Sequence, residues 1–303
     1  MVTSTAPSAP LLLADGARVV VDGVVVFDSL SFRTRGERVV LCGDYSPILR
    51  VLMGGGSPAT ARGSARVVAG KLEFAGVDVA HGAHATSLGV AFFDAPLPDG
   101  WTATRYLEWS ARLGGVASKE ARLRAEQSLE LVGAQALAGR ALRGLGVLER
   151  RLLGLAHAVV NLPSVLVCED PLAGLDADGV ECVRQAIASS TSGRAALVLL
   201  PRVTLAGPTA ELVTAATHLV SLAHGRIVFD GAPTALAAGA RLFAVTACGG
   251  VARFREELLA VGAEVSGSSH QFSVALPEGL AARDIVGAAA RAGAGLLGCS
   301  PVT

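Results

Sequence analysis

Residues around position 43 have the layout of a phosphate-binding site, in which a strand ends on glycine and a helix follows directly. Residues 36–43, GERVVLCG, predict a turn and then a strand, and residues 48–54, ILRVLMG, predict the start of a helix. A phosphate-binding loop of the form G-x-x-x-x-G-K-[ST] occupies this place between a strand and a helix. Such a loop directs successive backbone N–H groups and a helix N-terminus at the phosphates.

The residues that let such a loop bind phosphate are missing from this sequence. Gly43 is separated from the predicted helix by Asp44, Tyr45, Ser46 and Pro47, so the second glycine, the lysine and the following hydroxyl residue are absent. Asp44 places a negative charge where a polyanion would bind. Pro47 has no N–H to donate, although proline is also common at the start of a helix. Residues Gly43 to Ser46 therefore remain candidate binding residues only as the remnant of a phosphate loop.

Nearby cations do not replace the missing lysine. The chain has two lysines, Lys71 and Lys119, and neither lies in a glycine-rich turn. The nearest cation is Arg50. We interpret Arg50 as a surface residue, because a guanidinium is bulkier than an ammonium and differently hydrated.

Two adjacent carboxylates form the second candidate site. Glu169 and Asp170 follow the continuous apolar run Val165–Cys168, which is typical of a central parallel strand. At the end of a strand, one carboxylate could reach a metal ion and the other could accept a proton. The alternative is that both acids only cap the loop after the strand. The sequence predicts no other metal-ligand set.

Composition narrows the class of protein. The 303 residues suggest about two domains, 51% of them are apolar, and the formal net charge is +0 without a basic stripe. This balance argues against nucleic acid as a partner. Five scattered cysteines without a C-x-x-C pair favour buried thiols in a reducing compartment. No apolar run reaches the ~18 residues of a membrane span, and residues 1–10 predict a disordered leader.

Strands and helices alternate through most of the chain, which predicts an α/β fold with a parallel sheet. A hairpin is predicted over Asp22-Gly23. Further strands are predicted at 30–33, 38–41, 72–74, 90–93, 165–168, 195–200, 218–222 and 226–229. Helices are predicted at 104–113, 119–132, 148–160, 178–188 and 211–216.

The sequence changes character near residues 233–239. Beyond this boundary, strands at 242–246, 263–266, 272–276 and 295–298 alternate with helices at 252–261 and 281–292. This order, βαββαβ, predicts a small ferredoxin-like α+β domain over residues 240–303. It contains no cluster of residue types that carry chemistry.

These pieces, in this order, resemble the nucleotide-binding subunit of an ATP-binding cassette (ABC) transporter, a member of the P-loop NTPase class. The resemblance covers about residues 11–300, with the cassette over 11–235, and is greatest for the subfamily that serves ABC-2-type exporters. Residues 163–176, PSVLVCEDPLAGLD, resemble the Walker B strand and D-loop, and residues 219–231 resemble the late hairpin of the family. The resemblance makes Asp176 the D-loop aspartate.

By the same resemblance, Glu169 and Asp170 stand in reversed order, because the family has Asp before Glu. In the family the first carboxylate binds Mg²⁺ through water and the second orients the attacking water. Reversal displaces each carboxylate by one methylene, roughly 1.5 Å, and a misplacement of about 1 Å can cost around 100-fold in rate.

Other family positions carry different residues as well. The signature Leu-Ser-Gly-Gly-Gln corresponds to residues 145–149, LGVLE, and the Q-loop glutamine to Phe93. The switch histidine corresponds to Arg202 or Val203, and no aromatic residue stands at 21–22, where the family stacks adenine. We interpret His157 as a packing or surface residue.

The leading hypothesis is a degenerate, hydrolysis-deficient cassette subunit of an ABC-2-type transport system, with a structural or regulatory role. The resemblance implies ATP and Mg²⁺ as cofactors, and the altered residues predict that their binding is weak or absent. It also implies a multi-span permease partner, a second cassette or a second copy of this chain, and a cytoplasmic location at the inner face of the membrane. One alternative is a slow ATPase with an altered loop. Another is a scaffold protein outside transport.

Overall fold

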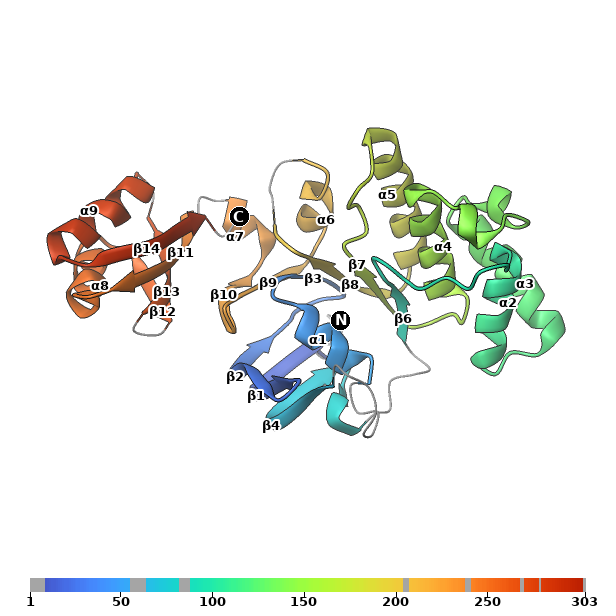
Figure 1. Cartoon of the computed structure of the whole chain (residues 1–303), viewed down its shortest axis with the longest axis horizontal. Helices are drawn as coiled ribbons and strands as arrows, with labels where there is room; N and C mark the ends of the chain where they lie inside the picture. Colours follow the sequence, from blue (N-terminus) through green and yellow to red (C-terminus); the bar gives the residue numbers. More distant parts are fainter. Residues whose placement is uncertain are drawn as a thin grey trace, which may run out of the picture.

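The computed structural model describes residues 9–54, 64–81, 88–203, 207–237, 241–267, 270–277 and 279–301, which form three β-sheets (Figure 1). Residues 1–8 of the expected leader lie outside the described residues. Within these ranges, no helix has the length and apolar character needed to cross a membrane.

The largest sheet holds six strands in the order β10-β9-β3-β8-β7-β6. Their bounds are β3 Arg38–Gly43, β6 Leu88–Ala91, β7 Val165–Glu169, β8 Ala195–Leu200, β9 His218–Ala223 and β10 Arg226–Gly231. Five of them are parallel, and β10 pairs antiparallel with β9 as an edge hairpin. The apolar runs of the central strands fit this place, because a parallel sheet is buried on both faces.

Alternate residues of the central strands supply different cores, as the period of two along a strand requires. Leu41 and Leu199 point into the core shared with the antiparallel sheet. Val40 and Val198 belong to the core on the opposite face, under the short helix α6, Ala210–Thr214. The phosphate-loop position at the end of β3 is therefore held between two packed layers.

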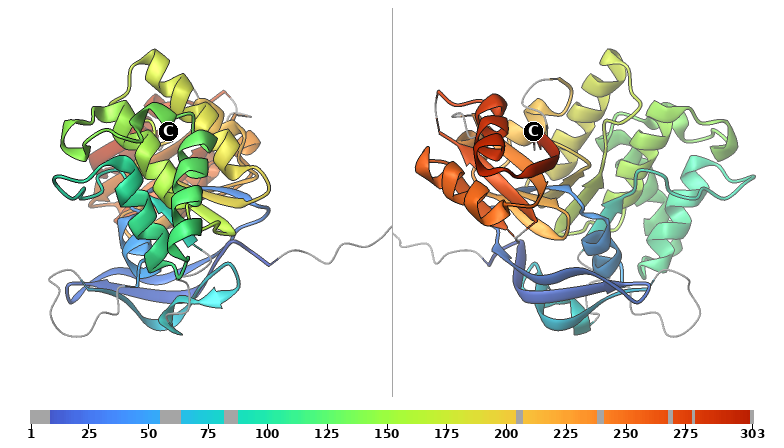
Figure 2. Two further views of the ribbon diagram at one scale, coloured as in Figure 1. Left: turned by 90° about the vertical axis from the view of Figure 1, so that its right-hand side faces the viewer. Right: turned by 60° about the vertical axis from the view of Figure 1, so that its left-hand side comes forward.

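Helices cover one face of this sheet, and the antiparallel sheet covers the other (Figures 1 and 2). The longer helices are α2 Ala103–Leu113, α3 Ser118–Leu131, α4 Val147–Val159 and α5 Ala177–Thr191. They pack together around fully buried Leu107, Leu129 and Leu153 and contact Leu166 and Cys168 of β7. The helices predicted from sequence are present, with ends shifted by a few residues.

The antiparallel sheet has the order β2-β1-β4-β5, with bounds β1 Leu12–Val21, β2 Val24–Arg33, β4 Ala65–Phe74 and β5 Val77–Asp78. The predicted hairpin over Asp22-Gly23 is confirmed, since Val21 faces Val24 and both turn residues have positive φ. Asn-Gly and Asp-Gly turns favour this conformation because it matches the twist of the strands.

One sequence prediction in this region was wrong in part. The strand predicted at 72–74 is the end of the ten-residue β4. Gly70 interrupts its pattern, because the residue has φ +69° and a Cβ there would lie 2.1 Å from the Gly16 carbonyl oxygen. The strands predicted on either side of Arg35-Gly36 are present and belong to different sheets, β2 to the antiparallel sheet and β3 to the six-stranded sheet.

The last sheet has the antiparallel order β12-β13-β11-β14 and carries two helices on one face. Its elements are β11 Arg241–Cys248, α8 Val251–Ala260, β12 Glu264–Gly267, β13 Gln271–Leu276, α9 Ala282–Ala292 and β14 Gly295–Pro301, after the short helix α7 Pro233–Ala237. This is the ferredoxin-like βαββαβ arrangement. Its core includes Phe254, Val274 and Ile285, which are fully buried.

Candidate functional site

The loop from Gly43 to Ser46 is a tight turn that closes onto the β9–β10 hairpin. Gly43 has φ +83°, and a Cβ there would lie 1.9 Å from the carbonyl oxygen of Leu222. The Asp44 N–H donates to the Leu222 carbonyl at 3.0 Å, and the Tyr45 N–H donates to the Gly43 carbonyl at 2.8 Å. Two amides that a phosphate loop would direct at its ligand are therefore bonded within the protein.

The carboxylate of Asp44 holds this turn to the hairpin. Its Oδ2 accepts the backbone N–H of His224 at 2.7 Å. His224 lies between β9 and β10 with φ +52°. The negative charge of Asp44 is thus fixed at the loop by a hydrogen bond that is charge-assisted.

A hollow opens beside the loop, at the carboxyl end of β3. It is lined by Val26, Phe27, Gly43, Asp44, Tyr45, Ser46, Pro47, Pro201 and Gly225. No lysine, arginine or histidine is among these lining residues, and Asp44 is their charged member. Arg50 of α1, Ser46–Leu52, is half exposed and lies 3.9 Å from a carboxylate oxygen of Asp22. The interpretation of Arg50 as a surface residue is confirmed.

Glu169 and Asp170 lie beside the same loop, at the end of β7. The Oε2 of Glu169 accepts the N–H of Phe93 at 3.2 Å. The Asp170 N–H donates to the Leu199 carbonyl at 2.8 Å, and Asp170 has φ +38°. Burial, with help from both carboxylates, raises the pKa of Tyr45 to about 12. Tyr45 is therefore a neutral neighbour of both acids at physiological pH.

The cation at this site is Arg151 of α4, which the sequence analysis did not single out. Its guanidinium donates to the carbonyls of Phe93 and, at 3.1 Å, Ala173, and it lies over the Phe93 ring at 4.2 Å. Burial lowers the pKa of Arg151, while Asp170, Asp94 and Glu169 raise it.

The same two effects act on Asp170 in opposite directions: burial raises the pKa of its carboxyl, and the positive charge of Arg151 lowers it. Arg151 stands two residues after Glu149, just beyond the signature positions. Its side chain therefore joins the loop after β6 to the loop after β7. A search for cations along the whole of the predicted helix 148–160 would have included it.

The signature and D-loop positions form helix caps. Gly146 precedes α4, and its N–H donates to Oε2 of Glu149 at 2.9 Å, while Glu149 also pairs with Arg140. Asp176 precedes α5 and accepts the N–H of Gly179 at 2.9 Å. Both carboxylates satisfy helix N-termini of their own chain.

Four other residues from the sequence analysis can be placed. Phe93 lies in the turn after β6 rather than in the predicted strand, because β6 ends at Ala91. Val203 is buried, whereas Arg202 is exposed, and residues 204–206 lie outside the described residues. His157 stacks on Tyr106 with ring centroids 5.0 Å apart, and burial lowers its pKa, so of the two interpretations, packing or surface residue, packing is confirmed.

Metal-ligating residues do not gather elsewhere in the part of the chain that the structure describes. No three His, Cys, Asp or Glu side chains there are placed to hold a metal ion. The five cysteines are free thiols; Cys42 and Cys168 are buried, and burial raises their pKa values to about 11 and about 12.

This architecture is similar to that of known proteins. No family model matches the chain. Its structure is similar to that of CbiO1 from Clostridium perfringens, part of the ABC transporter complex CbiONQ, with a TM-score of 0.60 and 15% identity over 76% of this chain and 91% of that one. The chain has the ATP-binding-cassette fold. The fold class expected from the sequence is confirmed.

Sequence comparisons agree with this cassette fold. The phosphonates import ATP-binding protein PhnC 2 of Haloquadratum walsbyi is 27% identical over 242 residues, which are 75% of this chain and 80% of that protein. ABC transporter G family member 22 of Dictyostelium discoideum is 27% identical over 150 residues, 46% of this chain and 22% of that protein. The cassette therefore spans most of PhnC 2 and about a fifth of the Dictyostelium relative.

Proposed function

We propose that this cassette is a hydrolysis-deficient subunit of a membrane transport system, which acts by occupying a position in the assembly. The observation that carries the proposal is the closed loop at Gly43–Ser46. Its Asp44 carboxylate is bonded to the His224 amide, and the Asp44 and Tyr45 amides donate to carbonyls of the protein. The loop's own polar groups thus take the place of phosphate contacts.

ATP with Mg²⁺ does not fit the residues at this site. A triphosphate needs converging donors and cations, yet the hollow beside the loop is lined by one carboxylate and no basic side chain. Arg151, the cation nearby, has both of its bonded guanidinium nitrogens on carbonyls of Phe93 and Ala173. Each charge-assisted hydrogen bond that is missing removes about 1.5–3 kcal/mol of binding.

The acids at the end of β7 support the same proposal. Glu169 accepts a backbone N–H of the loop after β6, and the charge of Arg151 lowers the pKa of the Asp170 carboxyl against the effect of burial. The Glu169 carboxylate is engaged within the protein, as expected if it stabilises a loop. Because Glu169 and Asp170 lie beside Tyr45 of the loop, they also favour the alternative, a slow ATPase. A measurement of nucleotide binding distinguishes the two proposals.

We expect the full chain to bind Mg-ATP with a dissociation constant weaker than about 1 mM in isothermal calorimetry. The reason is that the Asp44 and Tyr45 amides are already bonded within the protein and that the loop has no lysine to pair with the phosphates. An Arg50→Gln variant is the control and should behave like the parent, because Arg50 contacts Asp22 at the surface. A dissociation constant below about 50 μM for the parent would contradict the proposal and favour the slow ATPase.

The partners we propose are a multi-span permease at the inner face of the membrane and a second cassette. Cassettes of this family dimerise head to tail, so that each nucleotide contacts the phosphate loop of one subunit and the signature of the other. In this chain both positions differ, and the signature residue Glu149 caps its own helix. In a dimer with an intact cassette, this chain would supply the altered phosphate loop to one nucleotide site and the altered signature to the other, so both sites would be changed. Assignment to ABC-2-type export rests on the small C-terminal domain.

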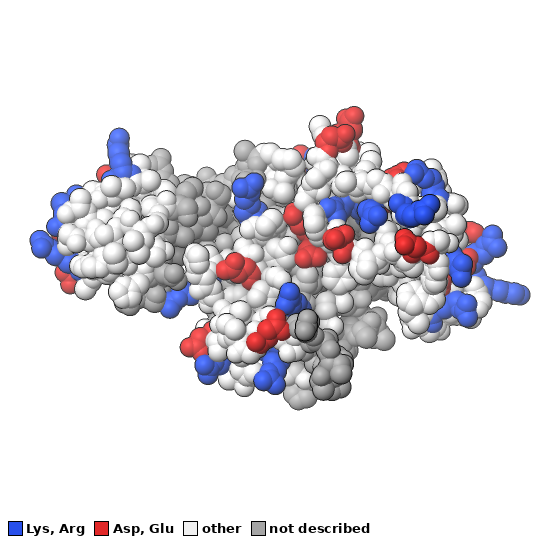
Figure 3. Space-filling model, viewed as in Figure 1, with Lys and Arg blue, Asp and Glu red and all other residues white. Residues whose placement is uncertain are grey.

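We further propose that residues 241–301 provide a contact between subunits. Strand β14 is an edge of its sheet, so its outer backbone groups can pair with another strand. Leu297 of this strand is 69% exposed, and Val286 of α9 and Leu259 of α8 are also exposed. Much of the C-terminal part is uncharged on the face in Figure 3, with basic groups near its outer rim.

We expect Leu297→Glu to lower the molar mass measured by light scattering from that of a dimer to that of a monomer. A charge on the edge strand opposes pairing with a second copy. Leu113→Glu is the matched control, because Leu113 is 68% exposed and its helix, α2, lies far from β14 in Figure 1. If both variants keep the mass of the parent, residues 241–301 pack only on their own cassette.

A further inference from the structure

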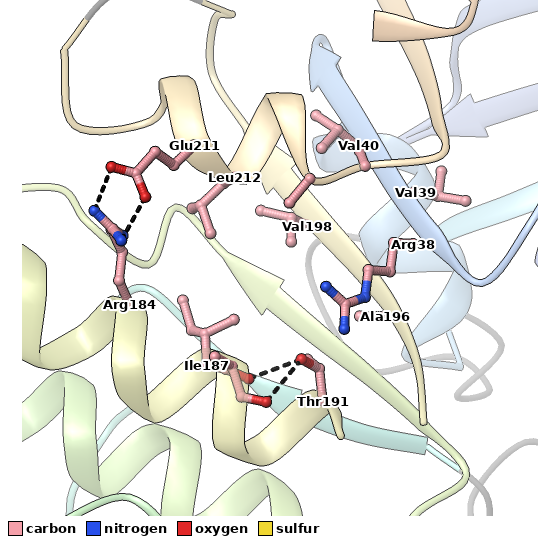
Figure 4. A pocket seen from close by; sticks show the side chains of 13 residues that line it. Arg38, Val39, Val40, Arg184, Ile187, Thr191, Ala196, Val198, Glu211 and Leu212 are labelled. Carbon is pink, nitrogen blue, oxygen red and sulfur yellow. Dashed lines mark hydrogen bonds and ion pairs between the residues drawn. The ribbon is translucent and has the colours of Figure 1, made fainter. Parts of the chain in front are cut away.

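A groove lies between α5 and α6 on the helix-covered face of the central sheet (Figure 4). Its volume is about 180 Å³, and apolar side chains of Ile187, Val198 and Leu212 contribute to its walls. It extends to Arg38 and Ala196 at the amino ends of β3 and β8, which pair in register. The Gly43–Ser46 loop lies at the opposite, carboxyl end of β3, so the groove is separate from that site.

Four alanines leave this space open. Ala188 of α5, Ala196 of β8, and Ala215 and Ala216 after α6 all line the groove. Ala188 and Ala215 are exposed, so longer side chains there would have room to extend over the groove. Small residues on both walls therefore create the gap between the two helices.

An ion pair bridges the helices at one end of the groove. Arg184 Nη1 lies 2.6 Å from Glu211 Oε1, and its second terminal nitrogen contacts the other carboxylate oxygen. Arg184 also lies 3.2 Å from Glu181. The charge of Arg184 is thus balanced within the protein, and the paired fork helps hold α5 and α6 at a fixed separation.

Arg38 stands at the other end without such a partner. Figure 4 shows its guanidinium directed toward Ala196 and Thr191, across the groove from the Arg184–Glu211 pair. No carboxylate of the described residues pairs with it. Its backbone is held, because its N–H donates to the Thr217 hydroxyl at 3.3 Å. The Thr191 hydroxyl donates to the Ile187 carbonyl at 2.9 Å, so its proton is already used within the protein and Arg38 remains the donor for an anion.

We propose that this groove binds a small carboxylate that carries one apolar ring or a branched chain of similar size. The carboxylate would pair with Arg38 in a bidentate arrangement, and the apolar part would lie between α5 and α6. The volume suits one ring, since an apolar cavity of about 150 Å³ holds benzene. Inorganic phosphate fits less well, because the apolar walls would leave most of its oxygens without donors.

The test is a titration of the full chain with benzoate, followed by two-dimensional amide NMR. We expect saturation with a dissociation constant on the order of 1 mM, the range for a ligand of this size. Benzyl alcohol, a neutral molecule of similar shape, should bind about tenfold more weakly, because it cannot form the ion pair. Shifted resonances should come from α5 and α6 rather than from the Gly43–Ser46 loop.

Four variants make the test specific. Arg38→Gln should weaken benzoate about tenfold, and Ala215→Leu should abolish saturable binding by filling the groove. Arg66→Gln is the control, since Arg66 is exposed on β4 of the other sheet and should leave the affinity unchanged. Ala188→Leu repeats the filling test from the opposite wall if Ala215→Leu fails to fold.

Three results would overturn the proposal. Absence of saturation at about 10 mM benzoate excludes the site at the expected affinity. Equal affinities for benzoate and benzyl alcohol exclude a carboxylate ligand. Equal losses in Arg38→Gln and Arg66→Gln show that benzoate responds to net charge alone. None of these results bears on Mg-ATP binding, which is measured separately.

Discussion

Gly43→Ala is expected to destabilise this protein by more than about 4 kcal/mol, the range of severe core defects. The added Cβ would lie 1.9 Å from the Leu222 carbonyl oxygen, at a residue with φ +83°. That oxygen belongs to the backbone of β9 and cannot rotate away. Relief therefore requires β3 and β9 to separate, with loss of the Asp44 bonds to Leu222 and His224.

Gly23→Ala is the matched control for this change. Gly23 has the same φ of +83°, but nothing lies within 4 Å of its Cβ position. It should therefore cost only the backbone strain of a left-handed alanine, about 1–2 kcal/mol. Urea denaturation followed by circular dichroism measures both variants. Equal midpoints would show that the contact between the loop and β9 contributes nothing.

Arg151→Met is expected to destabilise the protein by about 2–3 kcal/mol. The variant keeps much of the side-chain length but removes the hydrogen bonds to Phe93 and Ala173 and the charge over the Phe93 ring. Those bonds join α4 to the loops after β6 and β7. Thermal unfolding with and without the substitution gives the size of the effect.

The loss in Arg151→Met should depend on pH. Burial raises the pKa of Asp170 above its ordinary 3.8, and Arg151 opposes that rise. A carboxyl whose folded pKa is raised contributes its full stability below the unfolded pKa and loses it as pH increases. Without Arg151 the folded pKa rises further, so the defect should be greater at about pH 7 than at about pH 4.

Arg150→Met is the control for this prediction. Arg150 is the preceding residue of α4, is exposed, and donates one bond, to the Leu145 carbonyl at 3.2 Å. We expect a loss below about 1 kcal/mol without the same pH dependence. If both variants lose the same free energy at each pH, Arg151 does not act through Asp170 and the two loops.

Local patterns in the sequence determined the elements of this fold. The turn over Asp22-Gly23, the apolar run before Glu169 and the βαββαβ order beyond residue 240 each depend on neighbouring residues. The sequence also shows directly that no lysine follows Gly43 in the loop. Backbone preference and the period of apolar residues act over a few positions, so they predict elements and missing groups directly.

Only the tertiary structure decided what replaces those missing groups. Asp44 and His224 are 180 positions apart, and Arg151 and Phe93 are 58 apart. Sequence patterns do not specify which distant strands and loops come together, and hydrogen bonds require their donors and acceptors within about 3 Å. The groove that ends at Arg38 depends on the same long-range packing, because alanines from α5, from β8 and from the residues after α6 must come together before any space exists.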